Sequence, residues 1–287
     1  MPERIAEPPS GLLLIGKPAG VTSHDVVARV RHVLGVKKVG HAGTLDPMAT
    51  GLLILGVGRA TRLLRFLGDM PKVYEGSGVL GIETNTLDAE GQVTRERPVG
   101  VGEAELRASM SALTGDIDQS PPAFSAVKVG GERLYKSARR GEAVEAPPRR
   151  VRVDRFDLLR YDTPQFDFRV QCSSGTYVRS LVAEVGEKLG TGAHLSALRR
   201  KSIGPFRVED ATSPEDPGKL LPLDRAVAHL PEFTLHPEEA KVAVHGCCLG
   251  PAGIEGSYRA LAPDGKLIGI YRDKGAMAVP EIILAPA

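Results

Sequence analysis

The segment that most constrains this chain is a glycine-punctuated loop, residues 40–51 (GHAGTLDPMATG), which leads directly into the apolar residues 52–55. The loop holds one carboxylate, Asp46, and Pro47 behind it disfavours the α region at Asp46 and keeps that backbone extended. Glycine lets the loop turn sharply or approach a ligand closely. The sequence therefore predicts a stiffened loop, fixed to a buried strand, that presents one acid to a ligand. An ordinary Asp-Pro turn before a strand would show the same local pattern.

The rest of the chain has the composition of a soluble globular protein. Its 287 residues, 42% of them hydrophobic and 25% charged, suffice for one large domain and a small one. No apolar run approaches the length of a membrane span, and the N-terminus has acids and prolines where a signal peptide would be basic and then apolar. The three cysteines, Cys172, Cys247 and Cys248, lack the spacing of a disulfide framework or zinc site. We expect a cytoplasmic protein that binds no metal.

The net charge of +2 conceals basic segments and an acidic one. Residues 127–152 hold eight Lys or Arg against three Glu, and residues 59–72 and 196–207 are also rich in basic side chains. Residues 209–240 carry eight acids and only two basic residues. This segregation favours a basic face that binds nucleic acid, although the arginines of any one segment could equally be solvated surface residues.

Hydrophobic periodicity predicts helices and strands on both sides of the Asp46 loop. Residues 11–16 form an apolar run typical of a buried strand. Thr22 followed by Asp25 resembles a capping box, and valines continue at helical spacing until Gly35 closes the helix. Further on, the patterns predict a helix over 61–67, a strand over 72–81, a helix ending at 115, and a hairpin of strands 151–161 and 165–172. In the second strand of this hairpin, apolar and polar residues alternate, which places Phe166, Phe168, Val170 and Cys172 on one face.

Later segments have a less regular pattern. Residues 115–150 are irregular, basic and bracketed by prolines and glycines, which predicts an inserted RNA-gripping arm. We interpret residues 191–207 as a basic tail and residues 212–222, rich in proline and acids, as a linker. From residue 233 onward, short strands joined by turns predict a small, separate β-rich domain.

Arg179 falls in the first turn of a helix that Thr176 can cap. A cation there faces the positive end of the helix dipole, at a cost of a few tenths to about 1 kcal/mol. This position suggests a nearby anion, and Asp46 is the candidate, since a guanidinium would orient its carboxylate and keep it ionised. A solvated arginine would show the same spacing. Tyr74 and Tyr177, taken alone, are aromatic residues typical of half-buried packing.

An ordered series of motifs then identifies a family. It consists of residues 17–23 (KPAGVTS), the Asp46 loop, residues 81–91 (GIETNTLDAEG), 121–128 (PPAFSAVK) with Leu134-Tyr135, 175–179 (GTYVR) and 192–200 (GAHLSALRR). In this order, over about residues 10–210, the motifs resemble those of the TruB family of pseudouridine synthases, with Asn85 where an acid is common. The C-terminal domain resembles a PUA module more weakly.

The resemblance implies an α+β fold with a mixed, mainly antiparallel sheet core flanked by helices and an active-site cleft across it. A catalytic domain would span residues 1–230, with the basic insertion at 115–150, and a PUA-like RNA-binding domain would span residues 231–287. The implied reaction converts uridine 55 in the T-arm of tRNA to pseudouridine after the base is flipped out. The enzyme would need no cofactor or metal, have no obligatory protein partner and act as a monomer.

The same resemblance assigns residue roles. Asp46 would be the essential carboxylate, Arg179 its partner, and Tyr74 the residue that stacks on uracil and helps to remove the C5 proton. The remaining implied contacts are Tyr177 and Leu198 in the pocket wall, His41 in the space that the base leaves, and Arg62, Arg149, Arg150 and Arg199 on phosphates.

Two other functions stay open at this point. A non-catalytic tRNA-binding or RNA-folding protein could use the same basic face, and a guide-RNA-dependent synthase subunit could carry the same motifs. The chemical route also stays open among Michael addition, an acylal intermediate and a glycal intermediate.

Overall fold

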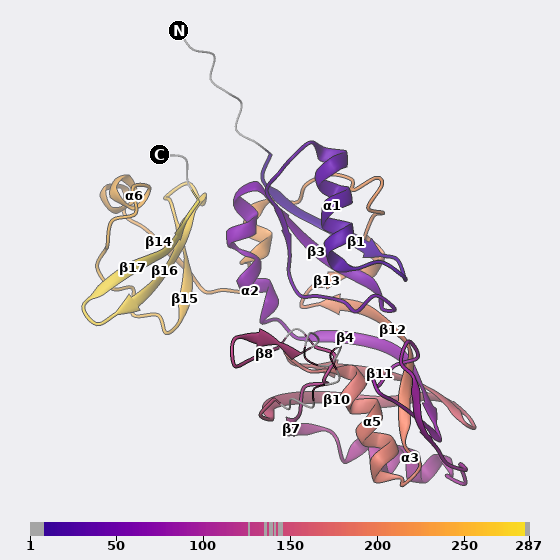
Figure 1. The fold of residues 1–287 in the computed structure, drawn as a ribbon. Helices are drawn as coiled ribbons and strands as arrows, with labels where there is room; N and C mark the ends of the chain where they lie inside the picture. The colour runs from indigo at the N-terminus through magenta and orange to yellow at the C-terminus, as the bar shows by residue number, and fades with distance from the viewer. Residues whose placement is uncertain are drawn as a thin grey trace.

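The computed structural model describes residues 9–125, 127–134, 137, 140, 142 and 146–284. Tyr135, Lys136 and Arg139 of the expected RNA-gripping arm lie outside these residues, as does most of the N-terminal segment read for targeting signals. The described chain forms a large sheet with helices packed against it and a smaller sheet near the C-terminus (Figure 1). No helix in this part is long and apolar enough to span a membrane.

The large sheet has nine strands in the order β1-β3-β12-β4-β11-β10-β7, with β2 added beside β3 and β13 beside β12. All pairs are antiparallel except β12 with β3. The strands are β1 (Gly11–Lys17), β2 (Val39–His41), β3 (Thr50–Val57), β4 (Lys72–Leu80), β7 (Gly115–Gln119), β10 (Arg149–Asp162), β11 (Gln165–Cys172), β12 (Ala193–Ile203) and β13 (Phe206–Arg207).

The first helix, α1 (Ser23–Leu34), begins and ends where the sequence predicts. Thr22 is its N-cap and closes a capping box with Asp25, and Gly35 ends it in the left-handed region. Before residue 230, the described helical segments also include η1 (Gly58–Arg62), α2 (Leu64–Gly68), α3 (Glu103–Ser111), α5 (Val178–Lys188), η2 (Val208–Asp210) and η3 (Leu223–Ala226). Two short hairpins pair β5 (Ile82–Thr84) with β6 (Val93–Glu96) and β8 (Lys128–Val129) with β9 (Glu132–Arg133).

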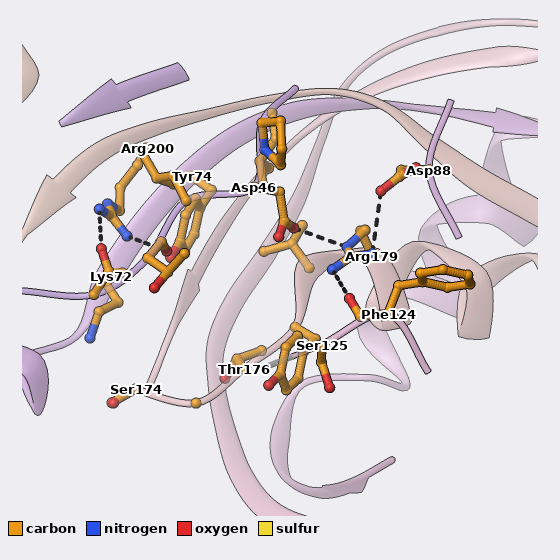
Figure 2. Close-up of a pocket in the computed structure, with 18 of the residues that line it drawn as sticks. Asp46, Lys72, Tyr74, Asp88, Phe124, Ser125, Ser174, Thr176, Arg179 and Arg200 are labelled. Atoms are coloured by element: carbon orange, nitrogen blue, oxygen red, sulfur yellow. Dashed lines mark hydrogen bonds and ion pairs between the residues drawn. The ribbon is translucent and has the colours of Figure 1, made fainter. Parts of the chain in front are cut away.

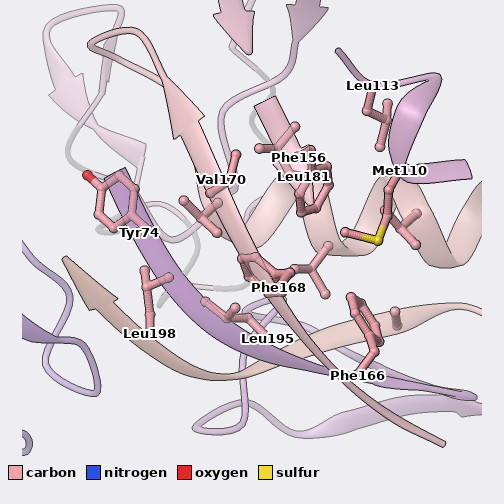
Figure 3. Packing of buried hydrophobic residues seen from close by; sticks show 14 of the residues in the cluster. Tyr74, Met110, Leu113, Phe156, Phe166, Phe168, Val170, Leu181, Leu195 and Leu198 are labelled. Carbon is pink, nitrogen blue, oxygen red and sulfur yellow. The ribbon is translucent and has the colours of Figure 1, made fainter. Parts of the chain in front are cut away.

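The core that positions the site lies between the sheet and helices α3 and α5. Along β11, Phe166, Phe168 and Val170 are buried on one face, as the alternation predicts. They belong to the same cluster as Met110 of α3 and Leu181 of α5 (Figure 3). Burial of such side chains contributes about 1.5–3 kcal/mol each. The packing therefore fixes α5, which carries Arg179, on this face of the sheet.

The C-terminal sheet has the order β14-β15-β16-β17. Its apolar residues Ile270 and Ile282 pack with Leu63 and Leu67 around α2. The small sheet therefore contacts the larger, N-terminal part of the chain directly. Its elements are β14 (Glu232–Thr234), α6 (Pro237–Ala243), β15 (Ser257–Leu261), β16 (Leu267–Lys274) and β17 (Met277–Ile283). The expected α+β class, with a mainly antiparallel sheet and a small β-rich unit after it, is confirmed.

Residues 191–207 were expected to be a basic tail, and that interpretation is wrong. Most of them form β12, which lies in the middle of the large sheet between β3 and β4. The consecutive basic residues concealed the strand, because Arg200 is only 1% exposed although its sequence neighbours suggest a surface. A buried arginine is rare without partners, and Arg200 is satisfied by three backbone carbonyls.

Three further expectations need correction. The segment 212–222 is not a free linker, because Thr212 and Leu221 exchange backbone hydrogen bonds with β1. Thr176 does not cap α5; its hydroxyl donates to the Ser173 carbonyl, and Tyr177 holds the N-cap position without a side-chain hydrogen bond. The helix expected over 61–67 divides into η1 and α2.

Candidate active site

A cavity of about 550 Å³ opens at the Asp46 loop (Figure 2). Its walls come from segments far apart in the sequence, since the loop, β4, β12 and the start of α5 all contribute side chains. Several of the predicted site residues face this space together, namely Asp46, Tyr74, Tyr177, Arg179 and Leu198.

Asp46 and Arg179 form the ion pair that the sequence predicts. Arg179 Nε lies 3.0 Å from Asp46 Oδ2. The arginine side chain is 5% exposed, whereas the aspartate side chain, which lines the cavity, is 39% exposed. The geometry thus leaves the carboxylate accessible to a ligand while its cation stays buried.

Arg179 also contacts a second acid, Asp88, which the sequence analysis missed. Arg179 Nη1 lies 3.3 Å from Asp88 Oδ2, and both side chains are 5% exposed. The same guanidinium donates to the carbonyls of Thr86, at 2.9 Å, and Phe124, at 3.0 Å. The polar turn 81–91 could have pointed to Asp88 as an ordered acid. A Thr and an Asp two residues apart can form a local hydrogen bond, as Thr86 and Asp88 do.

Burial raises the pKa of Asp46 above its ordinary value. Arg179 opposes this effect, and the negative charge of Asp88 adds to it. Arg179 was expected to favour the ionised form of Asp46, and its charge does lower the pKa of Asp46, but the loss of water has the larger effect on that pKa. A carboxylate with a raised pKa is a stronger base and nucleophile than an exposed aspartate.

The backbone of the Asp46 loop is held from the N-terminal motif. Lys17, 1% exposed at the end of β1, donates from Nζ to the carbonyls of Pro47, at 3.1 Å, and Ala49, at 2.7 Å. Gly20 donates its backbone N–H to the Pro47 carbonyl, and the Ser23 hydroxyl accepts from the Leu45 N–H. These bonds fix the loop on both sides of Asp46.

Replacing Lys17 by Met should displace this loop. The change leaves buried carbonyl acceptors without their donor, at about 1–3 kcal/mol for each acceptor. We expect a lower melting temperature together with a fall in catalytic rate that exceeds the fall in RNA affinity. Circular dichroism melts and single-turnover assays measure the two effects. Lys266→Met, at an exposed lysine paired with Asp264, is the matched control, and a Lys17→Met protein with wild-type rates would contradict the positioning role.

Gly51 and Arg200 hold the far end of the loop. Gly51 has φ +101°, and a Cβ there would lie 2.3 Å from the Arg200 carbonyl oxygen, so only glycine fits. Arg200 donates to the carbonyls of Gly43, Thr44 and Leu52. Arg200 therefore ties the loop to β12, a role that the sequence analysis did not recognise.

Tyr74, Tyr177 and Leu198 line the cavity from three different elements. Tyr74 on β4 is 8% exposed, and burial raises the pKa of its phenol. Leu198 on β12 is 9% exposed. Tyr177, half-buried at the start of α5, exchanges two backbone hydrogen bonds with the Gln119 side chain.

The other predicted contacts do not line this cavity. His41 on β2 lies in a separate groove with His24, their ring centroids 6.1 Å apart, and burial lowers its pKa. Arg62 donates to the Ile283 carbonyl of the C-terminal sheet. The three remaining arginines are exposed on strands of the large sheet: Arg149 and Arg150 at the start of β10, and Arg199 on β12.

The described residues contain no group of three or more His, Cys, Asp or Glu side chains placed to hold a metal ion. Two acids of the cavity, Asp46 and Asp88, are paired with Arg179 instead. The chemistry around Asp46 is that of an accessible carboxylate, a buried cation behind it and an aromatic wall.

Family models match most of the chain. TruB family pseudouridylate synthase (N terminal domain) matches residues 31–178, the tRNA pseudouridylate synthase B C-terminal domain matches residues 179–216, and tRNA pseudouridine synthase II, C terminal, matches residues 230–284.

Curated relatives and solved structures agree with these matches. The tRNA pseudouridine synthase B of Nocardia farcinica is 47% identical over 99% of this chain and 96% of its own length, and that of Thermobifida fusca is 46% identical over 96% and 98%. A chain in the crystal structure of a Cbf5-Nop10-Gar1 complex superposes with a TM-score of 0.76 at 27% identity, covering 96% of this chain and 85% of that one. This protein therefore belongs to the TruB family of pseudouridine synthases.

Proposed function

We propose that this protein converts uridine 55 in the T-arm of tRNA to pseudouridine, and that the reaction takes place in the cavity at Asp46. The observation that carries the proposal is an accessible carboxylate held against a buried arginine beside Tyr74. Relatives named tRNA pseudouridine synthase B, matched over nearly their full length, support tRNA as the substrate.

The reaction exchanges one bond for another within the nucleotide. The N1–C1′ bond breaks, the uracil turns, C5 joins C1′, C5 loses a proton and N1 gains one. No electrons enter or leave, so the protein needs to supply only positioning and acid–base or nucleophilic chemistry. Asp46 is the group for that chemistry, with Arg179 holding its carboxylate in place.

Tyr74 provides a surface for the flipped base. Stacking on an aromatic ring returns about 1–3 kcal/mol per base, which offsets the few kcal/mol needed to unstack the target. Because burial raises the pKa of Tyr74, its phenol is neutral at physiological pH and is a weak base. We therefore favour stacking as its main role, with Tyr177 and Leu198 as further walls.

Basic residues outside the cavity would hold the rest of the RNA. Arg149 and Arg199 are exposed, and Arg62 retains N–H donors beyond the one on Ile283. Arg150 is exposed too, and its solvent-facing pair with Asp118 could be exchanged for a phosphate. His41 has a lowered pKa, so its ring is neutral and suited to fill the gap left in the base stack.

We assign residues 1–230 to the catalytic domain and residues 231–287 to a PUA-like RNA-binding domain. The start of the second sheet at Glu232 and the family match over residues 230–284 support this division. We further propose a cytoplasmic enzyme that acts as a monomer without an obligatory protein partner.

Bare tRNA transcript provides the test. Purified protein incubated with the transcript alone should form pseudouridine at position 55, mapped by primer extension after carbodiimide treatment. A transcript with cytidine at position 55 should give no signal. Product that forms only when a guide RNA is added would assign the protein to guide-dependent synthases, and RNA binding without any product would leave the non-catalytic alternative.

A further inference from the structure

The cavity has a cationic end that the proposed chemistry does not use. Lys72 on β4 and Arg200 on β12 both line it, on the side of Asp46 opposite Arg179 and Asp88 (Figure 2). The two side chains come from paired strands and are 6% and 1% exposed. Two like charges buried at one place repel each other and are expensive to hide from water.

Neither cation is neutralised by an acid. Lys72 Nζ donates to the carbonyls of Gly68, at 2.6 Å, and Met70, at 2.8 Å. Arg200 donates to carbonyls of the Asp46 loop and β3. In the described part of the chain no ion pair joins either side chain to a carboxylate, whereas Arg179 in the same cavity contacts two. Within the described residues, no ion pair therefore neutralises the charge at this end of the cavity.

We propose that Lys72, backed by the charge of Arg200, binds the backbone phosphate next to the flipped nucleotide. The inference rests on the proposed function and adds a subsite to it. An ammonium has three N–H donors, and two of those on Lys72 are on carbonyls, which leaves one for a phosphate oxygen. The carbonyls of Gly68 and Met70 orient the ammonium group. Arg200, which has three of its five N–H groups on carbonyls, adds its positive charge behind it.

This arrangement would also make the phosphate contact responsive to pH. Burial and the charge of Arg200 lower the pKa of Lys72 to about 8, while Cys172 on β11 and Asp69 after α2 act in the opposite direction. Burial raises the pKa of Cys172 to about 11, so its thiol stays neutral over the working range. Below pH 8 Lys72 is charged and the contact is present; as pH rises through 8 the contact is lost.

The test is a double-mutant cycle that combines a substitution in the protein with a modification of the RNA. Its readout is binding affinity, so no turnover is required. T-arm stem-loops carry a neutral methylphosphonate in place of one phosphate, either 5′ or 3′ of the target uridine. With wild-type protein, one of the two positions should weaken binding about 10- to 100-fold, as expected for a lost hydrogen bond to a charged group. Lys72→Met should weaken binding to native RNA by a similar factor and show no further loss with that methylphosphonate.

Lys201→Met is the matched control, because Lys201 lies on the adjacent part of β12, outside the cavity, and pairs with Glu209. This variant should keep the full sensitivity to the methylphosphonate. Lys72→Arg, which retains the charge, should recover part of the coupling. The proposal would be overturned if the losses from Lys72→Met and from the methylphosphonate were additive. It would also be overturned if wild-type protein bound both methylphosphonate RNAs as tightly as native RNA, a result that does not require Lys72→Met to fold.

The same measurements separate this inference from the proposed function. Wild-type affinity for native RNA should fall between pH 7 and pH 9, and the fall should be absent with the sensitive methylphosphonate. If the stem-loop is bound with this coupling but no pseudouridine forms, the phosphate subsite stands and the catalytic assignment fails. If pseudouridine forms without the coupling, the subsite assignment fails and the function stands.

Discussion

Asp46→Asn should abolish pseudouridine formation while leaving tRNA binding intact. Asparagine has nearly the same shape, but its amide cannot act as a base and cannot form the ester bond to a sugar carbon that a carboxylate can form. Removing the group that performs the central step should lower the single-turnover rate about 10⁴-fold or more. The phosphate contacts that dominate RNA affinity do not involve Asp46, so the dissociation constant from filter binding should change little.

The melting temperature of Asp46→Asn provides a second measurement, because the pKa shift of Asp46 predicts the direction in which it should change. Burial raises the pKa of Asp46, so the folded state disfavours the ionised form relative to the unfolded chain. The penalty is present at neutral pH and disappears as pH falls and Asp46 becomes protonated. Asp46→Asn should therefore have a melting temperature equal to or above that of the wild type at pH 7, and the two should converge in acid.

The wild-type pH profile follows from the same shift. Activity should decline on the acid side at a higher pH than for an ordinary aspartate, because Asp46 must be ionised to react. Asp162→Asn, at an exposed residue on β10, is the matched control and should alter neither rate nor stability. An Asp46→Asn enzyme with substantial residual turnover would show that another group performs the chemistry.

Local patterns in the sequence were sufficient for the elements that depend on local chemistry. The capping box of Thr22 and Asp25 predicted the start of α1, and the alternation of β11 predicted its buried face. The glycines and Pro47 predicted a rigid loop at Asp46. In each of these cases, neighbours in the chain determine the conformation, so their spacing carries the information.

The features that sequence patterns did not predict depend on contacts between residues far apart in the chain. The strand β12 was missed because Arg199, Arg200 and Lys201 look like a surface segment, and only the carbonyls of β3 and the Asp46 loop make burial of Arg200 possible. Asp88 was missed for a similar reason, since its partner Arg179 is 91 positions away in sequence and reaches it through the fold. Buried polar residues whose partners are distant give no periodic signal.

The Asp46–Arg179 pair was predictable because one partner carried a local anomaly. A cation in the first turn of a helix opposes the helix dipole, and α5 does begin directly before Arg179. The sign of the Asp46 pKa shift was not predictable, because it depends on how completely the cavity excludes water. That quantity is a property of the packed walls rather than of the pair.

Arg179→Met should cost both stability and activity, because the arginine is the only cation in contact with two acids of the cavity among the described residues. Its loss leaves Asp88, 5% exposed, without a counter-ion and places the negative charges of Asp46 and Asp88 in the same low-dielectric space. Breaking a buried pair in this way costs about 3–5 kcal/mol, and the melting temperature should fall by roughly 10 °C for a chain of this size. Pseudouridine formation should fall with it, since Asp46 loses its orienting partner.

The destabilisation should itself depend on pH, which separates it from a packing defect. In the variant the negative charges of Asp46 and Asp88 repel each other without a counter-ion. Burial already raises the pKa of Asp46, so protonation of Asp46 as pH falls removes this repulsion, and the difference from wild type should shrink. Adding Asp88→Asn to Arg179→Met should recover much of the stability at pH 7 and none of the activity. Arg160→Met, at an exposed arginine on β10, should leave the melting temperature unchanged. A loss of stability that is equal at all pH values would mean that Arg179 acts through the hydrogen bonds to Thr86 and Phe124 rather than through its charge.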